Sequence, residues 1–180
     1  GSNGTLGLGG NYSTGVNRLY DCVLVPSVSG EPYQGNNTLF DGCRIGTASL
    51  RVSMTASVAA TITDCYLNLY MDGNAKGAIS RCYGKFSTRV RSGGDISMQR
   101  SVIVGPASGK TVVFEGTTSL GSSKMVYSNN VFEGAFTLCD INTARAAEIV
   151  AAASEFKNNL LYPSLVWDAE GRLGSVTTAS

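Results

Sequence analysis

The sequence contains no histidine, so the commonest general base and the commonest metal ligand are missing from any candidate site. Charged residues make up only 15% of the chain, and 14 Lys and Arg nearly balance 13 Asp and Glu. This balance predicts no broad electrostatic attraction for nucleic acid. No apolar run approaches the roughly 18 residues of a membrane-spanning helix, so we expect no membrane insertion. Neither a metal nor a cofactor is predicted.

Proline is also scarce, at 4 residues, whereas the 180-residue chain contains 22 glycines and many Ser, Thr and Asn. This composition is typical of a turn-rich β protein, and the length predicts one domain. We expect a glycine-rich lead-in or partial rung over residues 1–17. The folded body is predicted over residues 18–165, followed by a C-terminal cap and tail over residues 166–180.

A short frame repeats along most of the sequence. It reads apolar, two free positions, Cys, one free position, apolar, as in residues 62–67 (Ile-Thr-Asp-Cys-Tyr-Leu). The flanking positions are apolar or aromatic at 13 of 14 places, with Gly84 as the exception. The central residues, 21, 22, 17, 19, 29 and 29 residues apart, are Cys22, Cys43, Cys65, Cys82, Ser101, Asn130 and Asn159. Repeats of this length predict a solenoid in which equivalent positions stack into continuous columns.

The central position of the repeat is expected to point into the core. Four of the five cysteines occupy it, and no CxxC spacing of a zinc site is present. We therefore interpret these cysteines as small buried residues stacked as free thiols, which suits folding in a reducing compartment. An Asn at this position can adopt a left-handed conformation, and its amide can bond its copy on the next rung.

The connections argue for a coil rather than an antiparallel meander. The short turn lies inside the repeat, around the Cys, Ser or Asn, while the loops between repeats vary in length. One short helix is predicted in a loop near residues 143–153, because this stretch is rich in Ala and Asn142 or Thr143 can cap its start.

The frame resembles that of right-handed parallel β-helix proteins of the pectin-lyase-like group. Residues 127–132 (Tyr-x-x-Asn-x-Phe) and 156–161 (Phe-x-x-Asn-x-Leu) look like the asparagine-ladder turn of that group. The resemblance covers roughly residues 18–165. It implies an all-β, single-stranded, right-handed parallel β-helix of about seven rungs. The group includes pectate lyases, polygalacturonases, phage tailspikes and adhesin passengers, so the resemblance specifies the fold better than the function.

Carboxylates provide the candidate catalytic residues. Asp21 and Asp64 occupy the same position two rungs apart, which is roughly 10 Å and the upper limit for a glycosidase pair. Asp41 lies one position earlier on the rung between them. Arg81 and Arg100 follow Asp64 in the same column, which would suit a calcium-independent site for an anionic sugar. Alternatively, these Asp residues cap turns and the column is a solvated, salt-bridged face.

Aromatic residues provide the candidate ligand-binding site. Tyr66 and Tyr83 directly follow their cysteines, so we expect them to point outward on adjacent rungs, with Arg44 one rung earlier and Tyr70 nearby. Exposed, stacked tyrosines would suit the faces of sugar rings. Arg100, from the charged column, is the remaining candidate ligand-binding residue. The alternative is that the tyrosines pack across rungs, under a loop or against another subunit.

Three functions remain open from the sequence. The resemblance implies a glycan- or receptor-binding piece of a phage tailspike or tail fibre. Such a trimer would recognise a cell-surface polysaccharide or host receptor from the virion tail, after folding in a reducing cytosol. The second is a polysaccharide-degrading hydrolase or lyase, against which stand the missing His and the lack of a compact acidic pair. The third is a structural or adhesive stalk of a bacterial surface protein. Whether the chain is an enzyme stays open.

Overall fold

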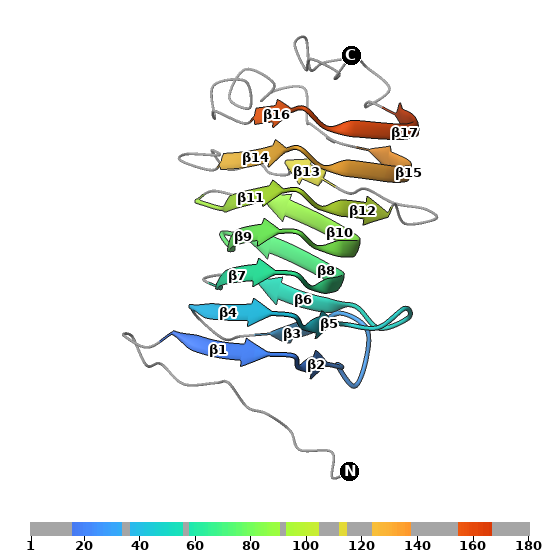
Figure 1. The fold of residues 1–180 in the computed structure, drawn as a ribbon. Helices are drawn as coiled ribbons and strands as arrows, with labels where there is room; N and C mark the ends of the chain where they lie inside the picture. The colour runs from blue at the N-terminus through green and yellow to red at the C-terminus, as the bar shows by residue number, and fades with distance from the viewer. Residues whose placement is uncertain are drawn as a thin grey trace.

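The computed structural model is an all-β parallel β-solenoid (Figure 1). It describes residues 16–33, 37–55, 58–90, 93–104, 112–114, 124–137 and 155–166. Within these ranges there is no helix, and hence none that could cross a membrane. The helix predicted near residues 143–153 lies outside them. The predicted coil of parallel strands is therefore confirmed for the described part of the chain.

Two parallel sheets form the walls of the solenoid. In spatial order, the first sheet consists of β1 (Asn17–Tyr20), β4 (Thr38–Asp41), β7 (Ala59–Thr63), β9 (Lys76–Ser80), β11 (Asp95–Gln99), β14 (Lys124–Ser128) and β16 (Glu155–Lys157). The second consists of β2 (Val23–Leu24), β5 (Arg44–Ile45), β8 (Tyr66–Gly73), β10 (Tyr83–Val90), β12 (Val102–Val104), β15 (Val131–Thr137) and β17 (Leu160–Val166). Next to β8 lies β6 (Val52–Thr55), paired with β3 (Glu31–Tyr33), and next to β10 lies β13 (Val112–Phe114).

Each strand pairs with its equivalent one turn away, as in a coil. Ile62 of β7, for example, pairs with Phe40 of β4 on one side and Ile79 of β9 on the other. About four turns, from β1 to β11, are described with gaps of only two or three residues. The apolar columns predicted on either side of the central position therefore meet inside the coil. They are no more than 1% exposed at Phe40, Ile45, Ile62, Leu67, Ile79, Met98, Ile103, Tyr127 and Phe132.

On each turn, one residue in the left-handed conformation turns the chain from the first sheet to the second. We call these residues the bend column. Their φ angles lie between 50° and 65°, at Asp21, Gly42, Asp64, Arg81, Arg100, Asn129 and Asn158. The N–H groups of the first six donate to a carbonyl on the next turn, as from Asp64 to Ser80 (3.2 Å). The predicted left-handed conformation at the central position was therefore wrong by one residue. The bend precedes that position, which lets the following side chain enter the core.

The central positions form a ladder of buried hydrogen bonds, which we call the ladder column. The Asn130 side-chain amide donates to Oδ1 of Asn159 (3.0 Å), and the Ser101 N–H donates to Oδ1 of Asn130 (3.0 Å). Asn130 and Asn159 also donate to the carbonyls of Met98 and Tyr127. The predicted bonding of each Asn to its copy is confirmed.

The free thiols continue the same ladder toward the N-terminus. The Cys43 N–H donates to the sulfur of Cys65 (3.3 Å), while the Cys65 thiol donates to the Thr63 carbonyl (3.0 Å). Where the ladder column changes from Cys82 to Ser101, the Cys82 N–H donates to Oγ of Ser101 (3.1 Å). Burial raises the pKa of the Cys43 thiol, so that thiol remains a protonated donor at neutral pH. The thiols are thus hydrogen-bonding members of the ladder as well as small core residues.

Replacing Cys65 with Ala should lower the free energy of unfolding by about 1–2 kcal/mol, because a small cavity and an unsatisfied Cys43 N–H remain. Cys65→Asn should retain more stability, because Asn fills the equivalent position at Asn130 and Asn159. Urea unfolding of the reduced protein measures both. Equal losses for the two variants would contradict the ladder role of this thiol.

Candidate ligand-binding site

The candidate site lies along the corner at which the chain leaves the first sheet. Side chains of the bend column and those two residues later point outward, because the ladder residue between them points inward. The second outward set, which we call the outer column, consists of Val23, Arg44, Tyr66, Tyr83, Val102, Val131 and Leu160. Its backbone is held by the ladder residues, since the N–H groups of Tyr66 and Tyr83 donate to the carbonyls of Cys43 and Cys65 (2.9 and 3.0 Å).

Three residues of the outer column stack on successive turns. The Arg44 guanidinium carbon lies 4.5 Å from the centroid of the Tyr66 ring, within the range of a cation–π contact. The Tyr66 and Tyr83 centroids are 6.2 Å apart, and their rings are tilted by 44°. Tyr83 is 53% exposed, so this stack ends in a ring open to solvent. The predicted adjacency of Arg44, Tyr66 and Tyr83 is confirmed, and we call this set the tyrosine stack.

Tyr70 belongs to a separate pair. The Arg51 guanidinium carbon lies 4.8 Å from its ring centroid, and Arg51 comes from the loop of residues 46–51 between β5 and β6. That loop also accepts a hydrogen bond at the Thr47 carbonyl from the Asn68 amide (2.7 Å). Asn68 lies between Tyr66 and Tyr70 on β8 and is only 7% exposed, so the loop separates the two tyrosines. The sequence does not reveal Arg51, because it lies outside the repeat.

The bend column carries the charges of the site. Arg81 forms a bidentate salt bridge with Asp64, in which Nε donates to Oδ1 (2.8 Å) and Nη2 to Oδ2 (2.7 Å). Both side chains are about half exposed. The Arg81 guanidinium holds the pKa of the Asp64 carboxyl below its ordinary value. An ionised carboxylate whose two oxygens already accept hydrogen bonds is poorly suited to act as a general acid. This half-exposed ion pair is what the alternative interpretation of the column, a solvated and salt-bridged face, predicts for Asp64 and Arg81.

The three predicted acidic residues do not gather into one cluster. The Asp21 carboxylate lies close to Gly42, since a Cβ added to Gly42 would be 2.5 Å from Oδ1 of Asp21. Asp64 turns instead toward Arg81 on the following turn, away from Asp21. Asp41 stays at the end of β4 on the first sheet. Among the described residues, no three His, Cys, Asp or Glu side chains meet in a way that could hold a metal ion.

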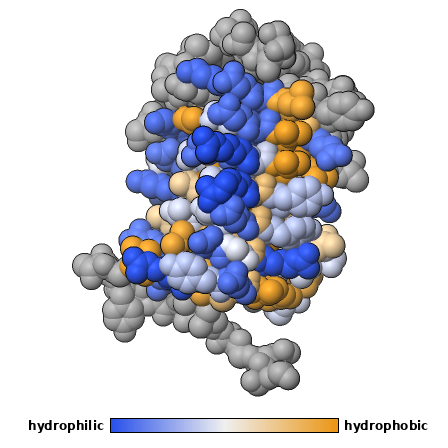
Figure 2. All heavy atoms as spheres, viewed as in Figure 1, coloured by the Kyte–Doolittle hydropathy of each residue, from blue (hydrophilic) through white to orange (hydrophobic). Residues whose placement is uncertain are grey.

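The space-filling view relates these two columns to the rest of the surface. Figure 2 shows hydrophilic side chains running up this corner, bordered on one side by a strip that is hydrophobic toward the C-terminal end. The outer column also becomes apolar in this direction, since it passes from Tyr83 to Val102, Val131 and Leu160, the last 60% exposed. The corner therefore offers charged groups and flat or apolar surface side by side, which is the combination that polar ligands with apolar faces require.

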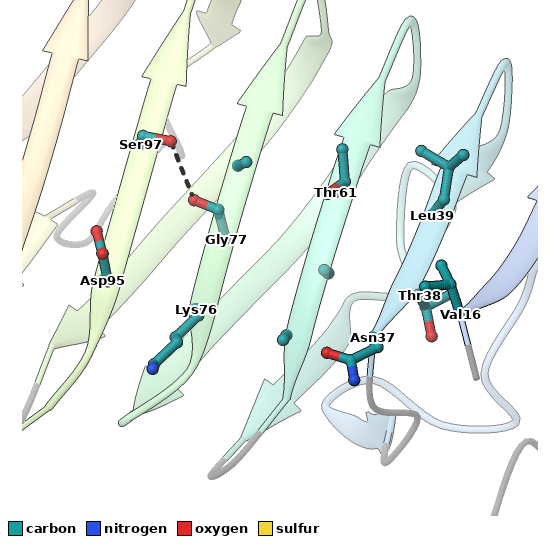
Figure 3. A pocket seen from close by; sticks show the side chains of 12 residues that line it. Val16, Asn37, Thr38, Leu39, Thr61, Lys76, Gly77, Asp95 and Ser97 are labelled. Atoms are coloured by element: carbon teal, nitrogen blue, oxygen red, sulfur yellow. Dashed lines mark hydrogen bonds between the residues drawn. The ribbon is translucent and has the colours of Figure 1, made fainter. Parts of the chain in front are cut away.

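A concave surface lies on the outer face of the first sheet (Figure 3). This groove of about 360 Å³ has a floor of small side chains, including Thr61, Ala78 and Ser97 on neighbouring strands. Lys76 and Asp95 line it as well, and Ser97 Oγ donates to the Gly77 carbonyl (3.4 Å). None of the residues predicted from the sequence lines this groove. Small residues in separate strands carry no signal until the register aligns them.

Comparison of the chain with family models, with curated proteins and with solved structures gave no match. No family is therefore identified, and the parallel β-solenoid rests on the strand register and hydrogen bonds described above. Function has to be inferred from the geometry of the sites themselves.

Proposed function

We propose that the protein binds glycans through the tyrosine stack. The observation that carries this proposal is the stacking of Arg44, Tyr66 and Tyr83 on three successive turns. An aromatic ring presents an apolar face and a polar hydroxyl, which together match the faces and hydroxyl groups of a sugar ring. A saccharide lying along the solenoid axis would pass a new position about every 4.8 Å.

The proposal extends to the kind of protein and its setting. A right-handed β-helix of seven rungs, assembled as a trimer in a phage tailspike or tail fibre, would present this stack to a cell-surface polysaccharide or host receptor. The four described cysteines, all free thiols, agree with folding in a reducing cytosol before release. A bacterial surface stalk is the alternative setting, and it would need no ligand at the stack.

A polysaccharide-degrading activity is the weaker candidate. Asp64 is committed to Arg81, and the carboxylates of Asp21 and Asp64 are directed to different turns of the coil. Both mechanisms of glycoside hydrolysis need a pair of carboxyl groups on either side of one bond. The site therefore supports recognition better than bond cleavage.

The test compares glycan binding by Tyr83→Ala with binding by Tyr20→Ala. Tyr83 and Tyr20 are equally exposed, at 53% and 54%, but Tyr20 lies outside the stack on β1. A glycan array first identifies a ligand for the wild-type protein, and calorimetry then measures affinity. We expect Tyr83→Ala to weaken binding by about tenfold or more, equivalent to roughly 1.4 kcal/mol, and Tyr20→Ala to leave it unchanged. Equal affinities for the two variants, or a wild-type protein that binds no glycan, would refute the proposal.

A further inference from the structure

Two arginines occupy backbone positions that disfavour them. Arg81 and Arg100 both have φ of 53°, in the left-handed region. A side chain with a Cβ is strained there, and Asn, Asp and Gly tolerate the region best. Other positions of the bend column use such residues, namely Gly42, Asn129 and Asn158. Strained backbone of this kind points to a functional reason for the residue that bears it.

The two arginines border the exposed end of the tyrosine stack. Arg81 precedes Tyr83 by two residues on the same turn, and Arg100 takes the equivalent position on the next turn, about 4.8 Å further along the axis. Their backbones are fixed, because the Arg81 N–H donates to the Gln99 carbonyl (3.1 Å) and the Arg100 N–H to the Ser128 carbonyl (3.3 Å). Both guanidinium groups are therefore carried on rigid positions at the corner.

At the Tyr83 end of the stack, the cations of Arg81, Arg100 and Lys85 outnumber Asp64, the one carboxylate in an ion pair there. Arg81–Asp64 is the one ion pair within 4.0 Å in the described part of the chain. The cations of Arg44 and Arg100 therefore face solvent without a carboxylate, and so does that of Lys85, two residues after Tyr83. Asp64 fixes Arg81 through two of its five N–H groups, which leaves three available to a ligand.

We infer that the glycan recognised by the tyrosine stack is anionic. Its carboxylate or sulfate group binds the Arg100 guanidinium, with Arg81 held beside it by Asp64, while a neighbouring sugar ring lies on Tyr83. Arginine suits this role because its planar fork matches two oxygens of a carboxylate or sulfate at once. The inference rests on the proposed glycan-binding function and adds the charge of the ligand to it.

The experiment measures binding of the full chain to hyaluronan, which carries carboxylates, to dextran sulfate, and to neutral dextran. The wild-type protein should bind at least one anionic polymer and prefer it to dextran. Arg100→Asn should weaken that binding by tenfold or more and reduce its dependence on salt. The same variant should unfold at an equal or higher temperature than the wild type, because Asn tolerates the left-handed backbone better. Lys124→Asn removes an exposed cation on the first sheet and should change nothing.

The outcomes separate this inference from the proposed function. If Tyr83→Ala abolishes binding while Arg100→Asn binds the anionic polymer as the wild type does, the tyrosine stack is the site and the anion site is refuted. A wild-type preference for dextran also refutes it. Loss of binding with Lys124→Asn to the same extent as with Arg100→Asn would show a nonspecific charge effect. The two anionic polymers decide between carboxylate and sulfate.

Discussion

Gly84→Ala is expected to lower the free energy of unfolding by on the order of 3 kcal/mol or more. Gly84 interrupts an apolar column between Leu67 and Ile103, and its φ is 134°. A Cβ at this position would overlap the carbonyl oxygen of Leu67 and lie 2.9 Å from the Leu67 nitrogen. Backbone cannot move aside without breaking the pairing of β8 with β10, so the substitution combines steric overlap with backbone strain.

Thermal and urea unfolding measure this effect, with Lys85→Ala as the control. Lys85 is the next residue on β10 and is exposed, so its truncation should change stability by no more than about 0.5 kcal/mol. A Gly84→Ala protein as stable as Lys85→Ala would show that the turns at Leu67 and Gly84 are not as closely packed as described.

Asn130→Ala should be the second severe change, costing roughly 3–5 kcal/mol. Asn130 is 1% exposed, and its side chain makes three hydrogen bonds, with the Ser101 N–H, the Met98 carbonyl and Asn159 Oδ1. In Asn130→Ala the Ser101 N–H and the Met98 carbonyl stay buried and lose the hydrogen bonds that the Asn130 side chain made with them. The expected loss exceeds that for Cys65→Ala because an amide supplies two donors and an acceptor, whereas a thiol is a weak donor and a weak acceptor.

The neighbouring asparagine provides the matched control. Asn129 lies in the bend column, is exposed and has φ of 57°, so Asn129→Gly keeps the backbone conformation at little cost. Asn130→Ser should recover part of the stability, because Ser101 fills the same position one turn earlier. If urea unfolding gave similar losses for Asn129→Gly and Asn130→Ala, the ladder would not be the stabilising element.

The order of the columns could be predicted from the repeat, because stacking places equivalent residues of successive turns side by side. This is why the tyrosine stack was predictable: Arg44, Tyr66 and Tyr83 each follow a ladder residue directly. The left-handed conformation was predicted at the ladder residue, whereas the residue before it adopts this conformation. The pattern shows that a turn occurs near Asn130, but only the hydrogen bonds show that Asn129 makes the bend while Asn130 enters the core.

Features that depend on side-chain direction or on loops were not predictable. Asp21 and Asp64 share a column, yet Asp64 turns to Arg81 because an opposite charge lies on the following turn. Arg51 reaches Tyr70 from a loop whose path no repeat specifies. The groove on the first sheet arises where Thr61, Ala78 and Ser97 fall in register on neighbouring strands.

The sequence by itself determined that this protein is a solenoid, which residues line its core and which follow its ladder outward. It could do so because the parallel register places equivalent residues of successive turns side by side, so one local pattern shows which side chains point inward and which point outward. The tertiary structure alone decided which charges pair, which of the described arginines lie outside an ion pair and where the surface is concave. Those properties depend on side chains from different turns and loops, and the distances between these side chains are set only when successive turns stack.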